Sequence, residues 1–275
     1  MTPLDLLRAV GPALLALAAA YSVDRLCAAK GVLPPGFAMP WRRGAAMALL
    51  AGVLWIGVFA PLGMLGLETE LDVAGLTIPR LFLLHAILAG TLLVWFLLGY
   101  AGSGGGLGRL FAAQFGFRAP QPARELGLGL VLGLASWAAA LGAMMAAALV
   151  VLTLGGEDAL PKAPPALFPW IAALPAGVRL LVSLSAGAVE ETFFRGFLQP
   201  RAGLLLSTLF FVLAHASYAQ PLMLVGVTVL SLLYGGLVRW RQSVWAAIAA
   251  HALFDAVQLL VVVPAALELL GRQAR

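Results

Sequence analysis

The sequence of 275 residues is too apolar for a soluble globular protein. Apolar residues make up 62% of it and charged residues 11%, and the mean hydropathy is +1.00. The net charge of +5 could suggest a nucleic-acid partner, but the 17 basic residues lie scattered between apolar runs. We therefore exclude nucleic acid and expect an integral protein of a lipid bilayer, the inner (plasma) membrane of a bacterium.

Hydrophobic runs along the chain predict an all-α bundle of about eight transmembrane helices, in a single membrane domain over residues 1–275. A spanning helix needs about 20 mostly apolar residues, and charges, Pro or Gly separate the runs. We expect the first run to stay as a span, because Pro12 interrupts it and no persuasive cleavage site follows. The expected spans are Ala9–Val23, Gly44–Leu67, Leu81–Ala101, Leu126–Leu154, Leu180–Gln199, Leu204–Tyr218, Pro221–Val238 and Val244–Leu269.

Basic residues alternate between the loops, and this alternation predicts the orientation of the bundle. Arg109 and Arg241 lie in loops rich in Arg and Lys, whereas Glu70 and Glu157 lie in the alternate loops. By the positive-inside rule, the basic loops face the cytoplasm and both termini face outward.

Two connecting segments have distinctive compositions. The run Pro161–Pro175 is too rich in proline for an ordinary span, and its aromatic residues favour an interfacial connection. The run Gly102–Gly108 predicts a flexible loop start. It lacks the Lys-Ser/Thr ending of a phosphate-binding loop.

Ionisable residues within the expected spans are concentrated in the last four helices. Each costs at least ~2.5 kcal/mol at the bilayer centre, so a functional role is the first hypothesis for each. The earlier spans contribute His85, which we expect to pack or to form a hydrogen bond between helices. The later spans contribute Glu190, Glu191, Arg195, His215, His251 and Asp255.

The spacing of these residues predicts how they pair. Glu191 and Arg195 are four residues apart and share a helix face, where they can form an ion pair. Glu190 lies about 100° further around the helix and is left for chemistry. His251 and Asp255 are also four apart and can reach a common atom.

Together these side chains could activate a water molecule in one of two ways. A carboxylate can accept the proton while imidazoles stabilise an oxyanion. Alternatively, a divalent metal such as zinc could bind to Glu190, His215, His251 and Asp255. With only Cys27 in the chain, a metal would need His and carboxylate ligands. The residues alone leave a hydrolase and a proton-coupled or ion-coupled transporter open.

Three motifs in order resemble those of the CPBP family of intramembrane proteases. They are Glu190-Glu191-x-x-x-Arg195, Phe211-x-x-x-His215 and His251-x-x-x-Asp255. The family includes CAAX prenyl endopeptidases and bacterial Abi-type proteins. The resemblance covers about residues 180–260, which we expect to form the catalytic core.

The resemblance implies a role for each matching residue. Glu190 would be the general base that activates water together with His215, and Glu191 and Arg195 would support it. His251 and the residue four later would stabilise the oxyanion. That later residue is often Asn in the family but is Asp255 here, and an ionised Asp cannot donate a hydrogen bond. The need for a catalytic metal stays open.

We therefore expect an intramembrane protease that cleaves a peptide or a membrane protein. Its polar cavity should open toward the cytoplasmic half, because Glu190 precedes Arg201 by a helical length of ~16 Å. The alternatives are a transporter that uses the same groups as a proton relay and a catalytically inactive scaffold that binds a membrane partner.

Overall fold

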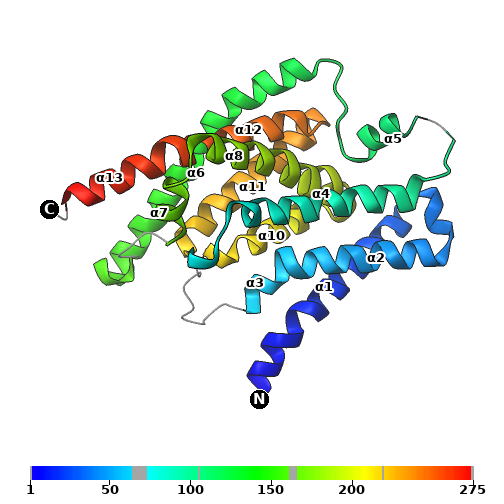
Figure 1. The fold of residues 1–275 in the computed structure, drawn as a ribbon, viewed down its shortest axis with the longest axis horizontal. Helices are drawn as coiled ribbons and strands as arrows, with labels where there is room; N and C mark the ends of the chain where they lie inside the picture. The colour runs from blue at the N-terminus through cyan, green and yellow to red at the C-terminus, as the bar shows by residue number, and fades with distance from the viewer. Residues whose placement is uncertain (1, 64–72, 105, 161–165, 219, 274–275) are drawn as a thin grey trace.

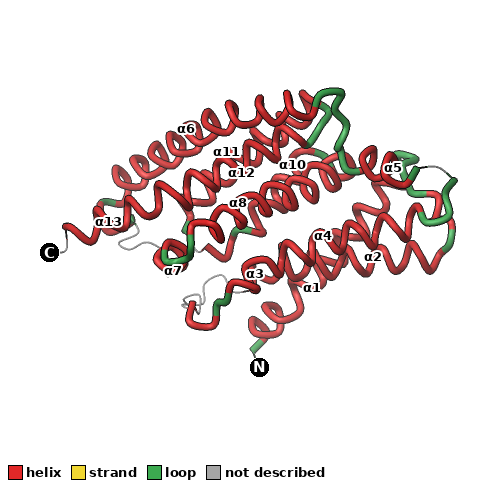
Figure 2. The backbone as a smooth tube through the Cα atoms, turned by 45° about the horizontal axis from the view of Figure 1, so that its top comes forward, coloured by secondary structure: helices red, strands yellow, loops and turns green. Residues whose placement is uncertain are grey.

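The computed structural model confirms the prediction of an all-α protein. It describes residues 2–63, 73–104, 106–160, 166–218 and 220–273, and within these ranges there is no strand (Figure 2). The α-helices are α1 (Pro3–Ala29), α2 (Pro40–Leu54), α3 (Ala60–Gly63), α4 (Ile78–Tyr100), α5 (Leu107–Gln114), α6 (Pro122–Gly155), α7 (Leu167–Ala172), α8 (Ala176–Glu191), α9 (Gln199–Ala202), α10 (Leu204–Ala214), α11 (Pro221–Arg241), α12 (Trp245–Val257) and α13 (Val263–Gln273).

Short π-helical and 3₁₀ segments join or extend several of these helices. The π-helical segments are η2 (Trp55–Phe59), η5 (Thr192–Leu198) and η7 (Gln258–Val262). The 3₁₀ segments are η1 (Pro35–Ala38), η3 (Val73–Gly75), η4 (Glu157–Ala159) and η6 (Ala216–Tyr218).

Six helices in the described ranges are long and apolar enough to cross a membrane, fewer than the eight expected. They are α1, α2 with its extension to Leu62, α4, α6, α11 and α12 with its extension to Arg272. The other two expected spans differ for separate reasons. The segment Leu180–Gln199 forms one helical rod through α8, η5 and α9, but it carries Glu190, Glu191 and Arg195. The segment Leu204–Tyr218 forms the short apolar helix α10, which has 11 residues.

Helix α8 lies between an N-terminal and a C-terminal group of helices (Figures 1 and 2). On one side it packs against α4, which contacts α2, and α2 contacts α1. On the other side it packs against α12, which contacts α6 and α11. The central position of α8 lets its two acidic residues face different neighbours.

Small residues allow α12 to approach both α6 and α8 closely. A Cβ atom at Gly187 of α8 would lie 2.7 Å from the Ile248 carbonyl oxygen, and one at Gly133 of α6 would lie 2.9 Å from the Ala250 carbonyl oxygen. Close packing of this kind is typical of helices in membranes. It brings the segment around His251 directly against the end of α8.

The two connecting segments agree only in part with the sequence predictions. In the run Pro161–Pro175, residues 161–165 lie outside the described residues, and the rest contains the short helix α7. The glycine-rich run ends in a further helix, α5, which the sequence did not predict. Glu70 also lies outside the described residues, and the orientation of the bundle stays a prediction.

Candidate active site

The two adjacent glutamates lie at the point where α8 changes from an α-helix to the π-helix η5. Glu191 is the last residue of α8, and Arg195 lies within η5, which covers Thr192–Leu198. All seven residues of η5 are buried. Single π-helical turns inside α-helices are rare and often occur at functional sites.

Glu191 lies in a charged group, which we call the Glu191 cluster: Glu191, Arg195, His251 and Asp255. The first three are buried, and Asp255 is partly exposed. Arg195 Nη1 lies 3.1 Å from Glu191 Oε1, so the ion pair expected from the spacing is present. The two side chains are 0% and 1% exposed. Arg195 also donates a hydrogen bond to Ser231 Oγ at 3.0 Å, and its guanidinium lies 4.0 Å from the centre of the Phe211 ring.

His251 connects the two carboxylates of this cluster. Its Nδ1 atom lies 2.8 Å from Glu191 Oε1, and its Nε2 atom lies 3.5 Å from Asp255 Oδ2. The ring is stacked on Tyr234, with 5.6 Å between the ring centres. Contacts on both nitrogens and on one face fix the orientation of this imidazole. The expected proximity of His251 and Asp255 is therefore present as well.

Glu190 lies among different neighbours, in what we call the Glu190 cluster: Glu190, His85 and His215. His85 Nε2 lies 3.4 Å from Glu190 Oε1, and His215 Nε2 lies 4.0 Å from Glu190 Oε2. Glu190 Oε2 is buried and has no hydrogen-bond partner. All three histidines of the chain thus contact one of the two adjacent glutamates.

The hydrogen bond at His215 Nδ1 shows which ring nitrogen carries the proton. His215 Nδ1 lies 2.7 Å from the carbonyl oxygen of Phe211. A carbonyl can only accept, so Nδ1 donates. In the neutral imidazole, Nε2 is then the acceptor that faces Glu190. The 4.0 Å gap between Nε2 and Oε2 is too long for a direct hydrogen bond, and a bridging water is the usual way to connect such groups.

His85 also belongs to this candidate site, which the sequence did not predict. The expected hydrogen bond between helices is present, because His85 Nδ1 lies 2.9 Å from Ser185 Oγ on α8. The contact with Glu190 was not expected, because His85 lies on α4 about a hundred residues away from the motifs. One signal could have found it: a buried histidine in a membrane span is costly unless it has a polar partner.

A cavity of about 190 Å³ adjoins the Glu190 cluster. Its lining includes Glu190 and His215 together with apolar residues of α4 and η2 and Ser217 of η6. Leu84 and Leu88, in the N-terminal half of α4, are part of the lining. Trp95, which contacts Arg201, lies in the other half of the same helix. The sequence led us to expect an opening on the Arg201 side. The cavity lies instead toward η6, whose Ser217 is part of its lining.

The expected metal ligands do not converge on one point. Glu190 and His215 belong to one cluster, whereas both nitrogens of His251 face the carboxylates of Glu191 and Asp255. Among the described residues, no three His, Cys, Asp or Glu side chains are arranged to hold a metal ion. The prediction of a metal bound by all four residues does not fit this geometry, and we derive no step through a metal.

Comparison with known proteins supports the resemblance seen in the motifs. Residues 172–257 match the family model described as type II CAAX prenyl endopeptidase Rce1-like. This segment contains both carboxylate clusters except His85, and the resemblance to the CPBP family is confirmed over it. The chain is also similar to Uncharacterized protein YpbD of Bacillus subtilis (strain 168), with 33% identity over 79 residues. That match covers 28% of this chain and 42% of the relative, so less than half of the relative's length is spanned. No solved structure matches.

Proposed function

We propose that the protein is an intramembrane endopeptidase that hydrolyses a peptide bond with a water activated by Glu190. The Rce1-like match over residues 172–257 supports a protease of this class. One observation carries the assignment of the base: Glu190 lines the cavity, and its Oε2 atom is buried without a hydrogen-bond partner and faces His215 Nε2 across 4.0 Å. Glu191 Oε2 also lacks a partner, but Arg195 and His251 already contact the Glu191 carboxylate through Oε1. A buried acceptor without a partner costs free energy, and a water in this gap would satisfy it.

The water in this gap would donate one hydrogen to each acceptor. Its first hydrogen would bind to Glu190 Oε2 and its second to His215 Nε2, which leaves an oxygen lone pair free for attack. When the oxygen attacks the peptide carbonyl, Glu190 accepts the proton and later returns it to the leaving amine. His215 keeps its orientation throughout through its hydrogen bond to Phe211.

His85 would hold the other oxygen of the same carboxylate. Ser185 Oγ lies 2.9 Å from His85 Nδ1 and holds the imidazole in place. With Nε2 as an N–H donor, His85 would bind to Glu190 Oε1, 3.4 Å away, and would fix the carboxylate with Oε2 toward His215.

The Glu191 cluster would support the reaction without donating or accepting its protons. Arg195 balances the charge of Glu191, and Glu191 fixes His251 through Nδ1. We propose that the side of His251 that faces Asp255 stabilises the oxyanion of the tetrahedral intermediate. The carboxyl of Asp255, whose side chain is 24% exposed, would take part as the protonated acid or by orienting His251.

The substrate we propose is a peptide or a segment of a membrane protein, and the location is the bacterial inner membrane. The cavity of about 190 Å³ can hold several water molecules or one extended peptide group. Its mostly apolar lining favours a segment with small or apolar side chains next to the bond that is cut.

Cleavage of a peptide library by the purified protein tests this proposal. We expect cleavage by the wild type and by the control Glu268→Gln, which removes an exposed acid of α13. We expect none above background from Glu190→Gln. A parallel reaction with a chelator tests the metal alternative: full activity there agrees with the water mechanism. Cleavage by Glu190→Gln at the wild-type rate would contradict the proposal and favour the scaffold alternative.

A further inference from the structure

A second and larger cavity lies at the end of the bundle where the basic loops meet. Its volume is about 500 Å³, and residues of α5, α9, α11 and the neighbouring loops line it. Four arginines are among the lining residues: Arg118, Arg195, Arg201 and Arg239. No aspartate or glutamate is among the described residues that line it. Its lining therefore carries an excess of positive charge.

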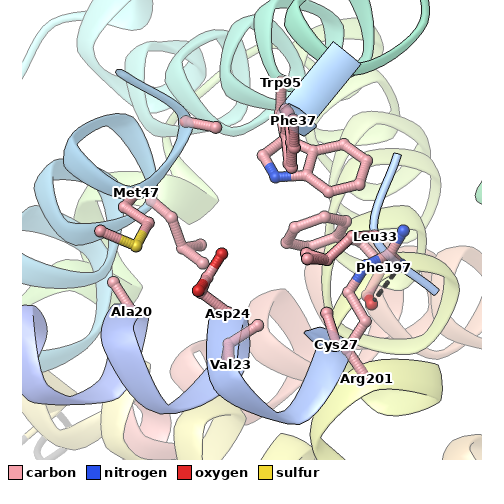
Figure 3. Close-up of a pocket in the computed structure, with 12 residues that line it drawn as sticks. Ala20, Val23, Asp24, Cys27, Leu33, Phe37, Met47, Trp95, Phe197 and Arg201 are labelled. Carbon is pink, nitrogen blue, oxygen red and sulfur yellow. Dashed lines mark hydrogen bonds between the residues drawn. The ribbon is translucent and has the colours of Figure 1, made fainter. Parts of the chain in front are cut away.

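Arg201 and Arg195 are the two buried members of this group, and the side chain of Arg201 is surrounded by protein. It is 4% exposed. Its guanidinium lies between two aromatic rings, 4.6 Å from the centre of Trp95 and 4.4 Å from that of Phe197. It donates to the carbonyl oxygen of Phe197 at 2.8 Å and to Gln114 Oε1 at 3.1 Å. Figure 3 shows Arg201 beside Cys27, with the bond to Phe197 dashed.

These contacts fix the position of the guanidinium but do not neutralise its charge. Arg195 has Glu191 as its partner, and Arg43 forms two hydrogen bonds to Asp24, at 2.9 and 2.6 Å. In the described part of the chain Arg201 has no carboxylate partner. Asp24 lies near it, on the turn of α1 before Cys27 (Figure 3), but its two oxygens are bound to Arg43.

One donor of Arg201 is also unsatisfied. Its Nε atom is buried and has no hydrogen-bond partner, and the residue lines the cavity. A buried charge without a partner is strongly unfavourable, and an N–H group of a guanidinium is a strong donor to phosphate oxygens.

We propose that this cavity binds a phosphate group, with Arg201 as the buried anchor and Arg118 and Arg239 at the exposed rim. A phosphate diester or monoester would supply the negative charge that Arg201 lacks. Two sources share this chemistry: the headgroup of an acidic phospholipid and free phosphate. The cavity lies at the membrane surface that the basic loops predict to be cytoplasmic, where acidic headgroups are accessible. The proposal does not depend on protease activity.

Thermal unfolding of the purified protein, stripped of lipid in a neutral detergent, tests the proposal and separates the two sources. Tryptophan fluorescence is a suitable signal, because Trp95 contacts Arg201. If a headgroup binds, phosphatidylglycerol raises the unfolding midpoint and phosphatidylcholine does not. If free phosphate binds, inorganic phosphate raises it more than chloride at equal ionic strength. If neither raises it, the proposal is wrong.

A pair of double variants tests the location of the site. Arg118→Gln with Arg239→Gln removes the rim and leaves the buried Arg201 in place, so the fold should survive. The control, Arg109→Gln with Arg124→Gln, removes the same charge from two exposed residues outside the cavity. We expect the rim variant to bind the effective ligand at least about tenfold more weakly than the wild type, and the control to bind within about twofold. Equal weakening in both variants would show that binding reflects overall charge alone and would contradict the site.

Discussion

The two carboxylate clusters differ sharply, although Glu190 and Glu191 are neighbours in the sequence. Glu191 Oε1 has an arginine and a histidine as partners, and its side chain is fully buried. Glu190 has two histidines as its described ion-pair partners, at 3.4 and 4.0 Å, and it lines a cavity. Each carboxylate keeps one oxygen without a hydrogen-bond partner, so the partners of the other oxygen and the cavity distinguish the two. Under the proposed function, one helix thus holds a supporting acid and a reactive acid side by side.

The position of α8 in the bundle produces this difference. Consecutive residues of a helix point about 100° apart, so Glu191 faces α12, which carries His251, whereas Glu190 faces α4, which carries His85. The close contact at Gly187 keeps α12 against the Glu191 side. On the other side, Glu190 lines the cavity, and Ala214 at the end of α10 is part of the same lining.

Removing the reactive acid should have the largest effect on activity. Glu190→Gln keeps the shape of the side chain but removes a base, so we expect turnover to fall by ~10²–10⁴ while the fold persists. Turnover with a fixed peptide and the thermal midpoint should be measured together. A loss of activity that comes with unfolding would assign Glu190 a structural role and remove the contrast between the clusters.

Removing the supporting acid should mainly destabilise the protein. Glu191→Gln leaves Arg195 buried without its partner, which costs ~3–5 kcal/mol. Expression level and the free energy of unfolding in detergent should both fall well below those of Glu190→Gln. If the two variants are equally stable, the proposed division between support and chemistry is wrong.

His85 distinguishes positioning from simple packing. His85→Asn can keep the hydrogen bond to Ser185 but loses the contact with Glu190, and we expect turnover to fall about tenfold. His85→Gln places an amide nearer to Glu190 and should retain more activity. The pH dependence of turnover should change in His85→Asn, since the base loses one of its two histidine neighbours. Two variants with equal turnover and an unchanged pH profile would indicate packing alone.

Asp255→Asn should have the smallest effect on activity. Asn supplies an N–H donor that an ionised Asp lacks, so activity should be kept or raised if this position stabilises the oxyanion. If Asp255 binds a metal, the variant should instead lose its activity and its metal content together. Turnover and elemental analysis of the same sample separate the two results.

The orientation of the bundle determines which cavity faces which side of the membrane. Single cysteines placed at Arg109 and at Glu157, in a chain with Cys27→Ala, should react from opposite sides. By the positive-inside rule, position 109 should be cytoplasmic. The reverse labelling would place the arginine-lined cavity on the outer side and the Glu190 cavity toward the cytoplasm.

The sequence predicted most of the site because its residues lie in short motifs on helices. The spacing of four residues was enough to pair Glu191 with Arg195 and His251 with Asp255. Contacts between helices distant in sequence carry no such signal, so His85 was left out of the site. The packing of α12 also produces the contact between His251 and Glu191, and it separates the candidate metal ligands into two clusters. Residue spacing within one helix cannot predict either result.

The shortness of α10 has a consequence for the surrounding lipid. Its 11 residues span about 16 Å, roughly half the thickness of a hydrocarbon core of about 30 Å. A helix of this length that begins at one membrane surface ends at a depth where lipid tails cannot satisfy backbone groups, and the chain turns there at His215 and η6. We expect the bilayer to be thinner beside α10, which would bring headgroups and water close to Glu190. Membrane thickness would then influence how readily a substrate segment unwinds and enters, and thin membranes would suit the protein best.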